Sequence, residues 1–99
     1  MTETKIVDFK GYSCKLIRGV YTNKRTALWL IDKDTEEPIC CATINIPEID
    51  LPEGYVFIKN WNENEGILDA LIEARIVEAP QTQHPLNWVT AYRCRLIED

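Results

Sequence analysis

The side chains able to do nucleophilic chemistry are one histidine and four cysteines. His84 is the only histidine, and it lies in the polar segment of residues 81–87. The cysteines are Cys14, Cys40, Cys41 and Cys94. A catalytic thiol needs a base beside it, so an enzyme of this kind would pair His84 with Cys94 or Cys14. A single histidine in a polar loop is typical of a solvated side chain, and we therefore expect a protein that is not an enzyme.

The cysteines also lack the spacing of a metal site. Structural zinc sites draw their ligands from close pairs such as CxxC or CxxH, and the chain has neither pair. Cys40 and Cys41 are neighbours on an expected strand, so their side chains point to opposite faces. The four scattered glycines form no phosphate-binding loop. We expect no metal, no cofactor and four reduced thiols.

Charge is unevenly spread along the chain, whose net charge is −5. Residues 1–31 carry six bases and two acids, whereas residues 48–78 carry eight acids and two bases. An acidic protein lacks the surplus of lysine and arginine that nucleic-acid phosphates require, so direct nucleic-acid binding is not expected. A small-ligand site in the basic part stays open, because a cation beside an aromatic ring could hold a nucleotide. Its residues would be Arg18, Tyr21, Lys24 and Arg25.

Trp61 is the aromatic residue whose surroundings point most to a partner protein. It lies between asparagines in the segment NWNENEG. One interpretation packs the indole against the start of a helix as a staple. The other makes it the anchor for a partner, since tryptophan is enriched in binding hot spots and nearby carboxylates would steer a basic surface. The partner-binding site predicted on this loop comprises Asn60, Trp61, Asn62, Glu63 and Glu65.

One helix is expected to position this loop. Apolar residues recur at the spacing of a single buried helical stripe; they are Ile67, Leu68, Leu71, Ile72 and Ile76. The stripe predicts a helix from Glu63 or Asn64 to about Ala74. Asn62 or Asn64 is expected to cap its start, because a side-chain oxygen there can accept the free backbone N–H groups.

Five main strand-like segments surround the helix, at residues 12–21, 26–31, 39–46, 55–59 and 88–97, and residues 5–9 are a first strand or its lead-in. Their order predicts an α+β fold, β-β-β-β-α-β, with a mostly antiparallel sheet of about five strands and one helix packed on it. Residues 1–99 form a single domain of ordinary size. Trp29 lies within an apolar strand and is expected in the core, and residues 81–87 are expected to form a polar loop.

The chain has no apolar run long enough for a membrane span, and residues 1–10 lack the features of a signal peptide. We therefore expect a cytoplasmic protein that does not enter a membrane.

Three segments carry a resemblance to a known group of domains. They read ALWLID, EPICCATINIP and VFIKNWNENEGILDALIEARIVE, and they cover about residues 20–79. Together they resemble a family of small domains of unknown function carried by phages, plasmids and conjugative elements of Gram-positive bacteria. The most specific match is at Lys59, Glu63, Asn64, Glu65 and Gly66. Arg75 stands where the family would have a glycine at the helix end. The resemblance implies an accessory protein of a mobile element and no catalytic residue.

These observations favour a non-catalytic accessory protein of a phage or mobile element. It would act in the cytoplasm of the host cell, where it would bind and inhibit a host or defence protein. Assembly into a homo-oligomer is compatible with the sequence. The alternative is a protein that sequesters a small ligand such as a nucleotide signal, and the second alternative is an uncharacterised enzyme.

Overall fold

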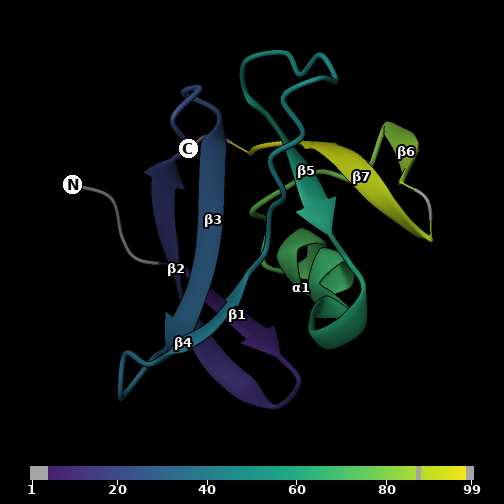
Figure 1. The fold of residues 1–99 in the computed structure, drawn as a ribbon. Helices are drawn as coiled ribbons and strands as arrows, with labels where there is room; N and C mark the ends of the chain where they lie inside the picture. Colours follow the sequence, from purple (N-terminus) through teal and green to yellow (C-terminus); the bar gives the residue numbers. More distant parts are fainter. Residues whose placement is uncertain (1–4, 87, 98–99) are drawn as a thin grey trace.

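The computed structural model describes residues 5–86 and 88–97. It has the predicted α+β fold, with antiparallel strands and one α-helix. The strands form two sheets of four and three strands rather than one sheet of about five. Figure 1 shows the helix α1 beside β5 and β1, with β6 and β7 at the far edge. Within the described residues, no helix has the length and apolar character needed to cross a membrane.

The four-stranded sheet is a meander of β1 (Ile6–Phe9), β2 (Tyr12–Val20), β3 (Thr26–Asp32) and β4 (Pro38–Cys41). The turn between β1 and β2 has only two residues, Lys10 and Gly11, and both have positive φ. Such a turn matches the right-handed twist of the strands that it joins. Short connections therefore fix the order of this sheet.

The three-stranded sheet has the order β5 (Tyr55–Lys59), β7 (Val89–Arg95) and β6 (Thr82–Leu86). The prediction of a polar loop at residues 81–87 was wrong, because Thr82–Leu86 pairs along β7 as an edge strand. Its proline has no N–H for a ladder, which an edge strand tolerates. The sequence pattern did not predict this strand, because apolar and polar residues do not alternate along the segment.

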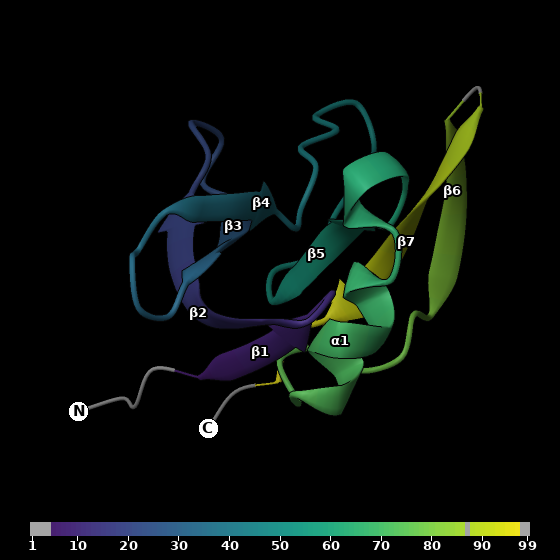
Figure 2. The same ribbon diagram turned by 90° about the horizontal axis from the view of Figure 1, so that it is seen from below.

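The two sheets are joined through the segment after β4. Lys59 donates its backbone N–H to the carbonyl of Ala42 at 2.8 Å, and Ile44 donates to Phe57 at 3.0 Å. The sheets consequently bend around one interior, which α1 closes on the side that faces the viewer in Figure 2. The main core fills this interior; its fully buried members include Val7, Leu28, Leu30, Val56, Ile58 and Leu71.

The helix α1 spans Ile67–Glu73, so it begins later than predicted. A short 3-10 turn at Asn62–Asn64 and the left-handed residue Gly66 precede it. The predicted caps, Asn62 and Asn64, were wrong. Asn60 binds the free N–H groups at the helix start instead. Its side-chain oxygen accepts hydrogen bonds from the backbone N–H groups of Gly66 at 3.1 Å and Leu68 at 3.0 Å.

The end of the helix agrees with the prediction of about Ala74. Arg75 has a φ of 61°, the left-handed conformation that usually falls to glycine after a helix. Its N–H donates to Ile72 at 3.0 Å, and that of Ile76 donates to Leu71 at 2.9 Å. These two bonds are the Schellman pattern. Arg75 therefore takes the left-handed conformation after the helix that glycine usually takes.

Candidate functional site

The helix-start loop uses several of its predicted site residues to hold the fold together. Asn60 accepts two N–H groups of the helix start, as described above. Asn64 is buried and donates its amide to the carbonyl of Cys41 at 2.6 Å, which ties the loop to β4. Lys10 also reaches this loop, where it donates to the backbone carbonyl of Glu63 at 2.9 Å. The loop is thus tied to the four-stranded sheet at two points.

Trp61 is partly buried and packs against a second apolar cluster, on the outward side of the three-stranded sheet. Phe57, Ala91 and Ile46 are the buried centre of this cluster. The remaining partly buried members are Ile44, Ile49, Leu51 and Leu86. The indole therefore stabilises the covering of this sheet, and the sequence could not show which side chains it meets.

The side chains of the loop that remain exposed are Asn62, Glu63 and Glu65. Lys59 lies 3.5 Å from Glu63. The backbone N–H of Glu63 and the charge of Lys59 lower the pKa of this carboxyl below its usual value. The exposed side chains of this loop are thus two carboxylates and one amide.

The four residues of the predicted ligand site do not converge on one point. Arg25 donates to the carbonyls of Ile46 at 2.7 Å and Ile49 at 2.6 Å, so it clamps the connection between β4 and β5. The hydroxyl of Tyr21 lies 2.9 Å from that of Thr43. Lys24 is exposed in the turn after β2, and Arg18 is exposed on β2. Arg25 and Tyr21 therefore use their polar groups in contacts that stabilise the fold.

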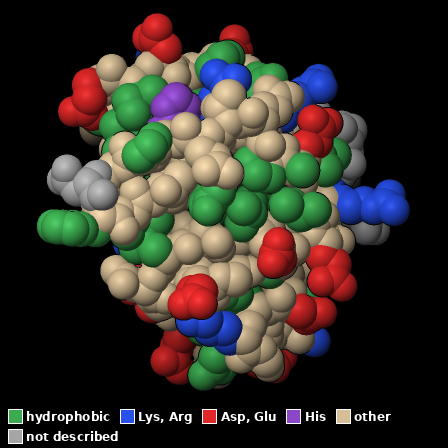
Figure 3. Space-filling model, turned by 90° about the vertical axis from the view of Figure 1, so that its right-hand side faces the viewer, with side chains coloured by type: hydrophobic (Ala, Val, Ile, Leu, Met, Phe, Trp, Pro, Cys, Tyr) green, Lys and Arg blue, Asp and Glu red, His purple; other side chains and the backbone are tan. Residues whose placement is uncertain are grey.

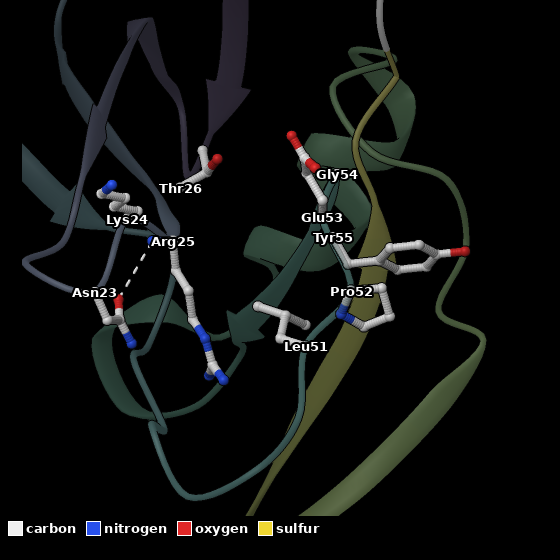
Figure 4. Close-up of a pocket in the computed structure, with 9 residues that line it drawn as sticks. All are labelled: Asn23, Lys24, Arg25, Thr26, Leu51, Pro52, Glu53, Gly54 and Tyr55. Atoms are coloured by element: carbon white, nitrogen blue, oxygen red, sulfur yellow. Dashed lines mark hydrogen bonds between the residues drawn. The ribbon is translucent and has the colours of Figure 1, made fainter.

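A shallow cavity of about 420 Å³ opens beside Arg25. Its walls are residues 23–26 on one side and residues 51–55 on the other. Figure 4 shows Arg25 and Leu51 extending toward the same space, whereas the ring of Tyr55 points away from it. The lining side chains include two cations, Lys24 and Arg25, and one carboxylate, Glu53.

His84 and the cysteines are not brought together as a catalytic pair. His84 lies on the outward side of the three-stranded sheet, with its ring 5.1 Å from that of Phe57 in an edge-to-face contact. Cys94 lies on the inward side in the main core. Burial raises the pKa of its thiol to about 12, which keeps it protonated and poorly nucleophilic at neutral pH. Cys14 is buried in the other sheet, so neither expected pair exists.

All four cysteines are free thiols. Burial, and then the neighbouring thiols of Cys14 and Cys41, raise the pKa of Cys40 to about 11. Over residues 5–86 and 88–97, no three His, Cys, Asp or Glu side chains are grouped so that they could hold a metal ion.

The outward face of the four-stranded sheet has exposed apolar side chains, together with the Lys15–Glu36 ion pair. Trp29 was expected in the core, but it lies on this face and is 37 % exposed, because side chains alternate along β3 and its neighbours Leu28 and Leu30 take the inward side. Ile17 of β2 pairs with Trp29, and Trp29 pairs with Cys41 of β4. In the next row Ile6, Lys15 and Ile31 lie side by side. We call Ile6, Ile17, Trp29, Ile31 and Cys41 the Trp29 face.

The indole of Trp29 is held in place on this face. Gly19 leaves the room for it: a Cβ atom at that position would lie 2.8 Å from Cζ3 of Trp29. The ring of Tyr21 lies 6.5 Å away, tilted by 48°. The hydrogen bond between the hydroxyl groups of Tyr21 and Thr43 in turn fixes this ring. The Trp29 face is therefore a preorganised surface, and the signal missed in the sequence was Gly19, which lies diagonally across the strands from Trp29.

A further tryptophan, Trp88, is 97 % exposed in the turn between β6 and β7. The hairpin of these strands projects from the body of the molecule in Figure 2. Trp88 contrasts with Trp29, since it has no ring contact among the described residues.

Comparison of the chain with protein-family models, with curated proteins and with solved structures gives no match. The resemblance to a family of mobile-element domains consequently stays a prediction from the sequence, and the function must be argued from the surfaces described above.

Proposed function

We propose that this protein is a non-catalytic accessory protein of a phage or other mobile element, which binds a host or defence protein and inhibits it. The observation that carries the proposal is the Trp29 face. A fixed indole and two exposed isoleucines are gathered on one face of the sheet. Single exposed apolar residues are common, but a contiguous apolar patch is typical of a protein-interaction site.

The shape of the face supports a protein partner. Trp29, at 37 % exposed, and Ile17, at 41 %, are neighbours in one cross-strand row. A partner that covered both would remove apolar surface from water at roughly 25 cal/mol per Å². Because the indole is already held by Gly19 and Tyr21, little side-chain freedom would be lost on binding. Aromatic anchors of this kind carry most of the energy in many interfaces.

The helix-start loop gives a second region for the same partner to contact. Its exposed residues, Asn62, Glu63 and Glu65, are acidic or polar and could steer a basic surface. The structural contacts of Asn60 and Trp61 leave less of this loop available than the sequence suggested. The Trp29 face is therefore proposed as the main contact and the loop as its accessory.

The experiment is affinity capture from a lysate of a Gram-positive host, followed by measurement of the dissociation constant with the purified partner. Ile17→Lys places a charge at the centre of the Trp29 face and should weaken binding at least about tenfold, a loss of about 1.4 kcal/mol. Val20→Lys is the matched control. Val20 is 71 % exposed on the same strand, but its side chain alternates to the other side.

A second pair of variants separates this site from a general aromatic effect. Trp29→Ala should weaken the complex, whereas Trp88→Ala removes the more exposed indole and should leave affinity unchanged. Glu65→Gln tests the loop and should have a small, salt-dependent effect. A partner whose affinity is the same for wild type, folded Ile17→Lys and folded Trp29→Ala would overturn the proposal.

A further inference from the structure

The outward face of the three-stranded sheet is cationic in an otherwise acidic protein. Strands β5, β6 and β7 contain three cations, Lys59, Arg93 and Arg95, and no Asp or Glu. All three lie on the outward face, because they share the alternation of Phe57 in the register. In Figure 3 the histidine lies beside a lysine or arginine side chain, and acidic side chains lie both in the upper part of this view and lower down.

Arg93 is the cation whose contacts are incomplete. Its guanidinium lies over the ring of Tyr55, with Cζ 5.3 Å from the ring centre. Its Nε is buried and has no hydrogen-bond partner among the described residues. Lys59 has Glu63 at 3.5 Å and Arg95 has Glu78 at 3.9 Å, but within residues 5–86 and 88–97 Arg93 lies near no carboxylate. A buried Nε–H group without an acceptor is costly, since it has given up water without gaining a partner.

Polar groups of β6 lie next to Arg93. Thr82 is its direct neighbour across the strands, and the Thr82 hydroxyl lies 3.3 Å from Nε2 of His84. Arg95 is two residues along the same face and keeps a loose pair with Glu78. One hydroxyl, one imidazole and two guanidinium groups thus face the same side of the sheet.

We propose that Arg93 and its neighbours Thr82, His84 and Arg95 bind an oxyanion of a small molecule, a phosphate or a carboxylate, against the ring of Tyr55. The guanidinium is a planar fork that matches two oxygens of either group, and its ring partner orients it before the ligand arrives. Tyr55 and Arg93 are 38 positions apart in the sequence (93 − 55), so only the pairing of β5 with β7 brings them together. This site is independent of the Trp29 face, which lies on the other sheet.

The site fits small anions better than nucleic acid. It has two arginines, and one of them is already paired, whereas a phosphate backbone is held by many cations. The second cluster covers the adjoining part of the face through Ile44, Ile49 and Leu51. The open area is therefore short, and a single phosphate or carboxylate group matches its extent.

The test is an NMR titration of the ¹⁵N-labelled protein at constant ionic strength. Inorganic phosphate, acetate and chloride are the three probes. We expect phosphate or acetate to give saturable shifts of the Arg93 Nε–Hε signal and of the Thr82 and His84 amides, with a dissociation constant on the order of 1–10 mM. Chloride should not. Saturation by phosphate alone identifies a phosphate ligand, and equal saturation by acetate identifies a carboxylate.

Two variants make the assignment specific. Arg93→Gln should weaken binding at least about tenfold, and Arg93→Lys should give an intermediate loss, because it keeps the charge but not the fork. Arg75→Gln is the control, since it removes an exposed arginine elsewhere and should change nothing. Shifts that are absent, that never saturate, or that persist unchanged in Arg93→Gln would overturn the proposal. Should Arg93→Gln fail to fold, Arg93→Lys alone decides, and unchanged affinity in that variant counts against the site.

Discussion

The outward faces of the two sheets differ, although both sheets turn their inward faces to the same main core. The four-stranded sheet leaves Trp29 and Ile17 open. The three-stranded sheet buries Phe57 and Ala91 on its outward face, beneath the segment of Ile44, Ile49 and Leu51. Both faces are built from antiparallel strands with apolar residues, so strand sequence alone does not decide which is covered.

The length of the connections explains the difference. The strands of the first sheet are joined by residues 10–11, 21–25 and 33–37, which are too short to fold back over a sheet. Residues 42–54 are long enough to cross the outward face of the second sheet, and Arg25 holds them there through two carbonyls. The covered part of the second sheet's outward face becomes a second small core, whereas the first sheet leaves apolar side chains exposed.

The largest loss of stability is expected from a substitution in the covered face of the three-stranded sheet. Phe57→Ala removes a ring that is 1 % exposed and should destabilise the protein by roughly 3–5 kcal/mol, measured from denaturant unfolding. Ile17→Ala, on the open face, is the matched comparison and should cost less than about 1 kcal/mol. Equal losses in the two variants would show that the faces do not differ in burial as described.

Trp61→Ala tests whether the helix-start loop belongs to the covered face. The indole is partly buried against the second cluster, so its removal should cost about 2 kcal/mol. Trp88→Ala provides the control, because an indole that is 97 % exposed should contribute almost nothing. An unchanged unfolding midpoint in Trp61→Ala would show that the indole does not stabilise the fold, and would favour the interpretation of Trp61 as an anchor for a partner.

Gly19→Ala probes the open face. The new methyl would approach the ring of Trp29 to 2.8 Å, so the ring must move and the fold should lose about 1–2 kcal/mol. Combining it with Trp29→Ala should abolish this penalty in a double-mutant cycle, because the obstacle is then gone. A penalty that survives in the double variant would mean that the glycine is needed for its backbone and not for the indole.

Arg75→Gly changes the junction between the helix and the second sheet. Arg75 holds a φ of 61°, which glycine adopts without strain, so the substitution should stabilise the protein by about 0.5 kcal/mol after the greater freedom of the unfolded chain is counted. Arg75→Ala keeps the strain and should bring no gain. Thermal unfolding of the two variants compares them, and a gain in both would point to the charge instead.

Asp32→Asn should give the smallest effect, at the end of β3 in the open sheet. The N–H groups of Thr35 and Asp34 donate to the Asp32 carboxylate and lower its pKa below the usual 3.8. A depressed carboxyl pKa contributes stability above the unfolded value, and this contribution is lost as pH falls through the folded value. The small deficit of Asp32→Asn at pH 7 should therefore shrink as pH falls below 3.8. A deficit that stays constant down to the acid transition would contradict a role for the charge.

The sequence alone determined the features that depend on neighbours in the chain. The stripe of Ile67, Leu68 and Leu71 is buried, as its 3.6-residue period predicted, since a helix places these positions on one side whatever it packs against. The α+β class and most strands followed from alternation and turns in the same way. Ala74 was placed correctly at the helix end even though Arg75 takes the position of a glycine.

Tertiary structure decided everything that depends on which elements meet. Thr82–Leu86 is a strand because β7 offers it a partner, not because of its own composition. Trp29 lies in an almost wholly apolar strand, so the sequence could not tell that no layer would cover its side of the sheet. Trp61 meets a cluster formed by a distant connection, and Arg93 meets Tyr55 only through strand pairing. Local periodicity assigns a side chain to a face, but contacts between segments far apart in the chain decide whether that face is buried, open or charged.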